Sequence, residues 1–199
     1  MGHTIPLPIR KAAAMWRTCT DDRAAQIAEF ALSLPLLVVF VVGIFDFSGA
    51  LSLKQKLTNA AREGARVAAA GPTNDLTGSS SGVPVSVSDA FQMVDNYLLS
   101  EKINDCGLTI QRPSLSTGLT WSSSATSGCP GFGLTLTINR GFVTTQSLNG
   151  IATDIVNTQV KIQYPYKWRF NRVITLLVPG ATYGSITYIS ANATAFNEN

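Results

Sequence analysis

Histidine is nearly lacking from this chain of 199 residues, since His3 is the only one. It lies close to the N-terminus, so the C-terminal region cannot form a Ser–His or Cys–His catalytic pair. Zinc sites draw mainly on histidine and cysteine, and the three cysteines form no CxxC motif, which disfavours a metal site. Glycine-rich phosphate-binding motifs are lacking too, and the acidic residues are scattered. We therefore expect no enzyme, no cofactor and no small-molecule substrate.

Charge is also scarce, at 14% of the residues, and the basic excess lies in the first 70 residues. Residues 1–24 carry four basic and two acidic side chains, and residues 25–70 carry four and three. Residues 72–199 hold seven of each sign. The net charge of +3 therefore forms no basic patch for nucleic acid, and we predict no nucleic-acid partner.

What the chain does have is an apolar run without charge over residues 30–45, followed by Asp46. With a helical rise of about 1.5 Å per residue, this run covers roughly 24 Å. Extending it to residue 53, with Asp46 near the far interface, reaches the roughly 30 Å of a bilayer core. The sequence predicts a transmembrane helix over about residues 30–53, inside a longer helix over residues 25–70.

The basic leader, residues 1–24, predicts a cytoplasmic N-terminus and an exported C-terminal domain. Cys106 and Cys129 would then lie in an oxidising compartment, where disulfides form. Closing their loop of about 24 residues would stabilise the domain by about 3 kcal/mol. Two unpaired thiols are the alternative. Cys19 would lie on the other side of the membrane, with no evident partner.

Several residues of the long helix suit close helix packing. Pro35 lacks a backbone donor, so we expect a mild kink there, which membrane helices tolerate. Small residues let a second helix approach closely, and they are Gly43, Ala60, Ala61, Gly64 and Ala65. Two interpretations stay open: this stripe packs on another subunit, or it packs on the chain's own domain. Asp46, Arg62 and Arg66 are interpreted as a polar helix face.

The C-terminal part predicts a small α+β domain over residues 88–199, after a flexible polar connector at residues 71–87. We expect a helix from Ser88 to near Ile103. Alternating residues predict strands at 108–110, 134–138, 158–164 and from 186 onward, and residues 168–178 are interpreted as a short helix. The expected fold is a long N-terminal transmembrane helix that extends into a domain with an antiparallel sheet and one or two packed helices.

Glu29 is a carboxylate at the mouth of the apolar run. Moving such a group inward is costly, about 2.5–3.5 kcal/mol for Asp at the centre of a membrane helix. One explanation is an interfacial side chain that reaches water. Another is a partner amine: if a peptidase cut after Ala24, the new α-amino group of Ala25, or that of a neighbouring subunit, could pair with Glu29 in low dielectric.

Three motifs in order carry a more specific signal: AAQIAEFAL from Ala24 with Pro35 beyond it, GIFDF from Gly43, and AAREGAR from Ala60. Together they resemble the TadE-like family, minor pseudopilins of the bacterial Tad (tight adherence, Flp pilus) system. The resemblance covers residues 23–70, and residues 160–166 are similar to the penultimate strand of that family. It implies a single-pass protein of the bacterial inner membrane that assists pilus assembly and surface adhesion, with its C-terminal domain periplasmic or extracellular.

By position, the resemblance implies that Ala24 precedes the cut of a prepilin peptidase, Ala25 becomes the mature N-terminus, Glu29 is the conventional acidic residue and Phe30 follows it. In that family, glycine is usual at the position that Ala24 occupies in this chain. Implied partners are the membrane, other pilins or pseudopilins, the Tad assembly machinery and, transiently, the peptidase. The alternative is an uncleaved membrane-tethered binding module, with a pocket lined by Trp121, Tyr164 and Trp168.

Overall fold

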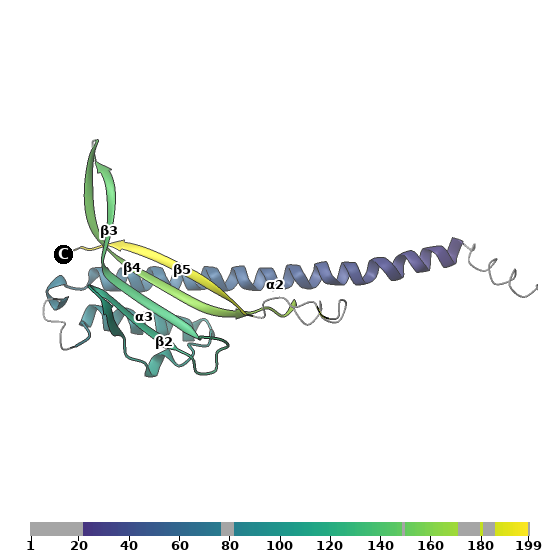
Figure 1. Cartoon of the computed structure of the whole chain (residues 1–199), viewed down its shortest axis with the longest axis horizontal. Helices are drawn as coiled ribbons and strands as arrows, with labels where there is room; N and C mark the ends of the chain where they lie inside the picture. The colour runs from purple at the N-terminus through teal and green to yellow at the C-terminus, as the bar shows by residue number, and fades with distance from the viewer. Residues whose placement is uncertain (1–21, 77–81, 149, 171–179, 181–185, 199) are drawn as a thin grey trace, which may run out of the picture.

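The computed structural model describes residues 22–76, 82–148, 150–170, 180 and 186–198. Its longest element is helix α2 (Asp22–Ala70), 49 residues that reach about 74 Å at 1.5 Å per residue. The predicted long helix is confirmed, and it runs through Pro35 without interruption. Figure 1 shows the N-terminal half of α2 standing alone, while the rest of the protein packs along its C-terminal half.

Among the residues that the structure describes after α2, eight elements have defined bounds: two short 3-10 helices, one α-helix and five strands. They are η2 (Thr73–Leu76), α3 (Val85–Ser100), η3 (Leu108–Ile110), β1 (Ser114–Thr117), β2 (Thr120–Ala125), β3 (Leu134–Leu148), β4 (Ile151–Lys167) and β5 (Ile186–Phe196). The strands form one antiparallel sheet in the order β1-β2-β3-β4-β5, so each strand pairs with its neighbours in sequence. The predicted α+β fold is therefore confirmed.

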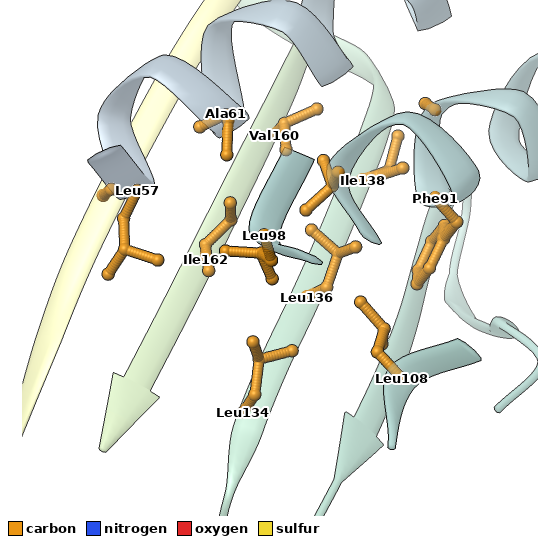
Figure 2. Packing of buried hydrophobic residues seen from close by; sticks show 14 of the residues in the cluster. Leu57, Ala61, Phe91, Leu98, Leu108, Leu134, Leu136, Ile138, Val160 and Ile162 are labelled. Carbon is orange, nitrogen blue, oxygen red and sulfur yellow. The ribbon is translucent and has the colours of Figure 1, made fainter. Parts of the chain in front are cut away.

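One face of the sheet carries the core, as the alternation in β3 and β4 predicts. Leu136 pairs with Ile162 across the ladder and Ile138 pairs with Val160, and all four are fully buried. Figure 2 shows these side chains meeting Leu57 and Ala61 of α2 and Leu98 of α3. Both helices thus cover the same face of the sheet. The other face is polar, with Thr137, Gln159, Lys161 and Asn192 among its residues.

The hairpin formed by β3 and β4 extends well beyond this core. Its register shifts between Asn139 and Phe142, and the strands then continue pairing as far as Leu148 and Ile151. Figure 1 shows this distal part projecting away from the rest of the sheet. Val143 and Val156 remain exposed there.

Helix α3 begins at Val85, not at Ser88, so the predicted connector was three residues too long. The reason is a distant cap: the Ser86 amide donates to Oδ2 of Asp75 at 2.9 Å, which satisfies a donor of the first turn. Residues of η2 thereby fix the start of α3, and no local cap pattern reveals this.

Residues 108–110 form the 3-10 helix η3 and not the predicted strand. The preceding Cys106 and Gly107 have positive φ angles of 57° and 80°, which turn the chain out of an extended path. Strands β1 and β2 were not predicted at all, because their sequences are mostly serine and threonine. The predicted helix at 168–178 lies mainly outside the described residues.

Candidate functional site

The N-terminal half of α2 is a largely apolar surface that the other described residues leave mostly exposed. An 18-residue window of this helix has a mean hydropathy of 2.4, and none of it is buried. Leu32, Phe40 and Phe45 are each more than 60% exposed. An exposed apolar helix of this length is the kind that a bilayer covers. The helix therefore indicates single-pass membrane anchoring.

Glu29, Ala25 and Phe30 lie on this bare part, and all three side chains are exposed. Within the described part of the chain, no residue forms a hydrogen bond or ion pair with the Glu29 carboxylate. The peptide bond between Ala24 and Ala25 lies in the first turn of α2, where helices fray most readily. The four residues of the predicted processing site thus lie in one helical segment near the N-terminal end of α2.

Four of the five residues of the small-residue stripe lie in the C-terminal half of α2, where they pack against the chain's own domain. Ala60, Ala61 and Ala65 are at most 1% exposed, within the core formed with α3 and the sheet. A Cβ added at Gly64 would lie 2.6 Å from Cγ2 of Val94, so glycine lets α2 and α3 approach closely here. Of the two interpretations left open, the structure realises packing on the chain's own domain.

Asp46 holds the base of this domain against α2 (the Asp46 clasp: Asp46, Gly49, Tyr166 and Phe170). The Tyr166 hydroxyl donates to Oδ1 and to the main-chain oxygen of Asp46, each at 3.0 Å. The Phe170 amide donates to Oδ2 at 2.8 Å. A Cβ at Gly49 would lie 3.0 Å from the Tyr166 hydroxyl. Asp46 is only 6% exposed, so its carboxylate is bound within the chain.

The predicted polar face of Asp46, Arg62 and Arg66 was therefore wrong. At about 100° per residue, both arginines lie about 160° around the helix axis from Asp46. Arg62 is exposed, and the exposed Arg66 pairs with Glu63 at 3.1 Å. Gly43 likewise faces the chain itself, since a Cβ there would lie 3.7 Å from the Phe170 ring.

A disulfide joins Cys106 to Cys129, with 5.4 Å between their Cα atoms. Asn104 reinforces the same loop, because its side chain donates to the Gly128 carbonyl at 3.1 Å. The Tyr164 hydroxyl of β4 donates to the Asn104 carbonyl at 2.9 Å. Burial, with the nearby Asp105 charge, raises the pKa of Tyr164. These contacts fix the segment after α3 to the loop between β2 and β3 and to strand β4.

Arg140 is a functional candidate that the sequence did not indicate. It is 1% exposed, and its Nη2 donates to the Gly71 and Pro72 carbonyls at 3.1 and 3.4 Å, just past the end of α2. Burial lowers its pKa, an effect that the charge of Asp75 opposes. A cation at a helix C-terminus is favourable, and the last turn of α2 has no basic residue of its own. Arg140 supplies that cation from β3.

The three aromatic residues considered for a ligand pocket do not share one. Trp121 is buried in the core, Tyr164 bonds to Asn104, and the Trp168 indole donates to Thr187 at 2.7 Å. A cleft of about 630 Å³ does lie beside α3, but it is lined by Phe91, Asp95 and Arg112 among others, and by neither tryptophan. Among residues 22–76, 82–148, 150–170 and 186–198, no group of three or more His, Cys, Asp or Glu could hold a metal ion.

No curated protein and no solved structure matches the chain. A family model described as TadE-like protein matches residues 24–66. This range contains the exposed span, Asp46 and the whole small-residue stripe. The match supports a protein associated with the Tad pilus, in a family whose members are structural. Over residues 24–66, this chain is therefore similar to the TadE-like family.

Proposed function

We propose that the protein is a TadE-like pseudopilin, a membrane-anchored structural component that assists assembly of a Tad-type pilus or a related secretion apparatus. It lies in the bacterial inner membrane with its N-terminus in the cytoplasm and its C-terminal domain outside. The observation that carries this proposal is the division of α2: one half is bare and apolar, and the other half is the central support of a folded domain.

The bare half provides the surface through which such a subunit contacts lipid and other pilin-type helices. Glu29 lies at its inner end without a partner in the described chain. In the proposed assembly, a prepilin peptidase cuts after Ala24, and the amine of Ala25, on the same or a neighbouring subunit, pairs with Glu29. Such a pair is stronger in the low dielectric of a membrane than in water.

The covered half provides rigidity. The stripe of buried alanines and Gly64 seats α2 against α3 and the sheet, and the Asp46 clasp ties the base of the domain to the end of the span. A rotation or pull on the membrane helix is therefore transmitted to the exported domain. A component that helps to build a fibre from the membrane needs this kind of mechanical continuity.

The test of processing is the intact mass of the protein from cells with and without the prepilin peptidase of the same Tad system. We expect the peptidase to remove residues 1–24. Ala24→Gly should increase the cleaved fraction, Ala24→Leu should abolish cleavage, and Met15→Leu in the leader is the matched control. Identical masses with and without the peptidase would refute processing.

Assembly is tested separately, by co-purification with the other pseudopilins of the system and by surface adhesion. We expect Glu29→Gln to reduce both while leaving the protein in the membrane. Unchanged complexes and unchanged adhesion would refute the proposed role of this carboxylate.

A further inference from the structure

A second cleft of about 630 Å³ lies at the base of the domain, between α2, the end of α3 and the end of β4. Its wall on α2 includes Val42 and Phe45, which belong to the predicted membrane span. Its rim carries Lys102, Lys167 and Arg169. The cleft is thus apolar on the side that enters the bilayer and cationic on the side that leaves it.

The basic residues at the rim of this cleft outnumber the carboxylates that are free to pair with them. Glu101 lies in the same cleft, but it pairs with Lys56 at 3.0 Å. Asp46 is already bound by Tyr166 and Phe170. No carboxylate in the described segments lies within ion-pair distance of Lys102, Lys167 or Arg169. Three cations therefore converge on one cleft with no anion of the protein assigned to them.

The depth of the cleft matches the layers of a bilayer. With Asp46 near the outer interface, Lys167 and Arg169 lie at that level, because the neighbouring Tyr166 and Phe170 bond to Asp46. The headgroup layer extends roughly 5–8 Å past the hydrocarbon core on each side. Val42 lies four residues, or about 6 Å, on the inner side of Asp46. Thus Lys167 and Arg169 are at the level of the lipid headgroups, and the wall formed by Val42 and Phe45 is at the level of acyl chains.

We propose that this cleft binds one anionic phospholipid. Its headgroup lies among Lys102, Lys167 and Arg169, and an acyl chain lies along Val42 and Phe45. The lipid thereby links the exported domain to the leaflet from which it emerges. This inference requires that α2 spans a bilayer, but it requires neither pilus assembly nor peptidase cleavage.

Three observations favour a lipid over a soluble phosphate compound or a protein segment. The apolar wall is continuous with the span, so hydrocarbon is already adjacent to it. Phe45 is 75% exposed and offers a surface that a small hydrophilic anion would leave in contact with water. The edge-to-face pair of Tyr166 and Trp168, with ring centroids 5.0 Å apart, lies at the same level, where aromatic residues favour the membrane interface.

The test uses the full chain reconstituted in phosphatidylcholine bilayers that contain spin-labelled phosphatidylglycerol or, in a parallel sample, spin-labelled phosphatidylcholine. The motionally restricted fraction of each label gives the preference of the protein for the anionic lipid. Each basic residue near an anionic lipid contributes about 1 kcal/mol, which is about fivefold in affinity. We expect a clear preference for phosphatidylglycerol in the wild type and its loss in the triple variant Lys102→Gln, Lys167→Gln, Arg169→Gln.

Two control variants make the result decisive. Lys54→Gln removes a cation of α2 that does not line the cleft, and it should keep the preference. The variant Lys102→Arg, Lys167→Arg, Arg169→Lys keeps the charges, and it should keep the preference as well. The inference is overturned if the glutamine variant binds like the wild type, or if either control loses the preference. Displacement of the lipid by soluble glycerol phosphate would also overturn it, since that marks a site for the free anion.

Discussion

The Asp46 clasp gives the most direct prediction. Asp46→Ala removes the carboxylate that accepts from the Tyr166 hydroxyl at 3.0 Å and from the Phe170 amide at 2.8 Å. Hydrogen bonds to a charged group each contribute about 1.5–3 kcal/mol. The Tyr166 hydroxyl keeps the main-chain oxygen of Asp46 as an acceptor, so the loss is smaller than the sum of two bonds. We expect the free energy of unfolding to fall by about 2–4 kcal/mol.

For a protein of this size, such a loss lowers Tm by roughly 5–15 °C. The assay is thermal unfolding in detergent, followed by near-ultraviolet circular dichroism, together with hydrogen exchange of the Phe170 amide. Exchange at Phe170 should accelerate more than exchange in the core of β3. Asp89→Ala is the control, because Asp89 is an exposed carboxylate on α3 and its removal should change stability by less than about 0.5 kcal/mol.

An Asp46→Ala variant with wild-type Tm and wild-type exchange at Phe170 would refute the clasp. An equal effect of Asp89→Ala would refute it as well, since the loss would then reflect charge in general. Tyr166→Phe provides an internal check. It removes only one donor and should lower stability by less than Asp46→Ala does.

Three further predictions concern packing, the disulfide and pH. Gly64→Ala should destabilise the domain by about 1–3 kcal/mol, because the new Cβ would press on α3, whereas Gly82→Ala has open space and should be nearly neutral in thermal unfolding. Cys129→Ser should lower the free energy of unfolding by about 3 kcal/mol, as measured by denaturant titration, and a reductant should have no effect on the variant. Burial, the hydrogen bond to Asp46 and the charge of Asp46 raise the pKa of Tyr166 above 10.0, so the stability that its neutral form contributes is complete below pH 10 and declines above it. Tyr166→Phe should flatten that decline, and equal slopes in both proteins would contradict the assignment.

The parts of the fold with a local pattern were predictable from the sequence. The long helix follows from one uninterrupted apolar run, and β3 and β4 follow from alternating Leu, Ile and Val residues. Strands β1 and β2 lack this alternation, and their extended form depends on pairing, of β2 with β3 and of β1 with β2. The start of α3 depends on Asp75, which lies eleven residues from Ser86.

The candidate site was predictable only where it is linear in sequence. The segment from Ala24 to Phe30 and the stripe from Ala60 to Ala65 are continuous motifs, although which surface the stripe contacts required the structure. Asp46 could be singled out as a charge in an apolar segment, but its partners are 120 and 124 residues away. No pattern in one sequence indicates such a pair. The same is true of Arg140 and the end of α2, which are 69 residues apart.

The late position of β5 in the chain has a consequence for the timing of folding. Its residues Ala191 and Ala193 complete the surface on which α2 packs, and the Glu198 amide reaches the Ala69 carbonyl at 3.4 Å. Contacts between such distant segments form slowly, because a long loop must close first. Until β5 is added, the part of α2 that β5 covers is therefore open to other helices. In the proposed assembly, a newly made subunit would have an interval in which that surface can meet a partner, and completion of the sheet would end it.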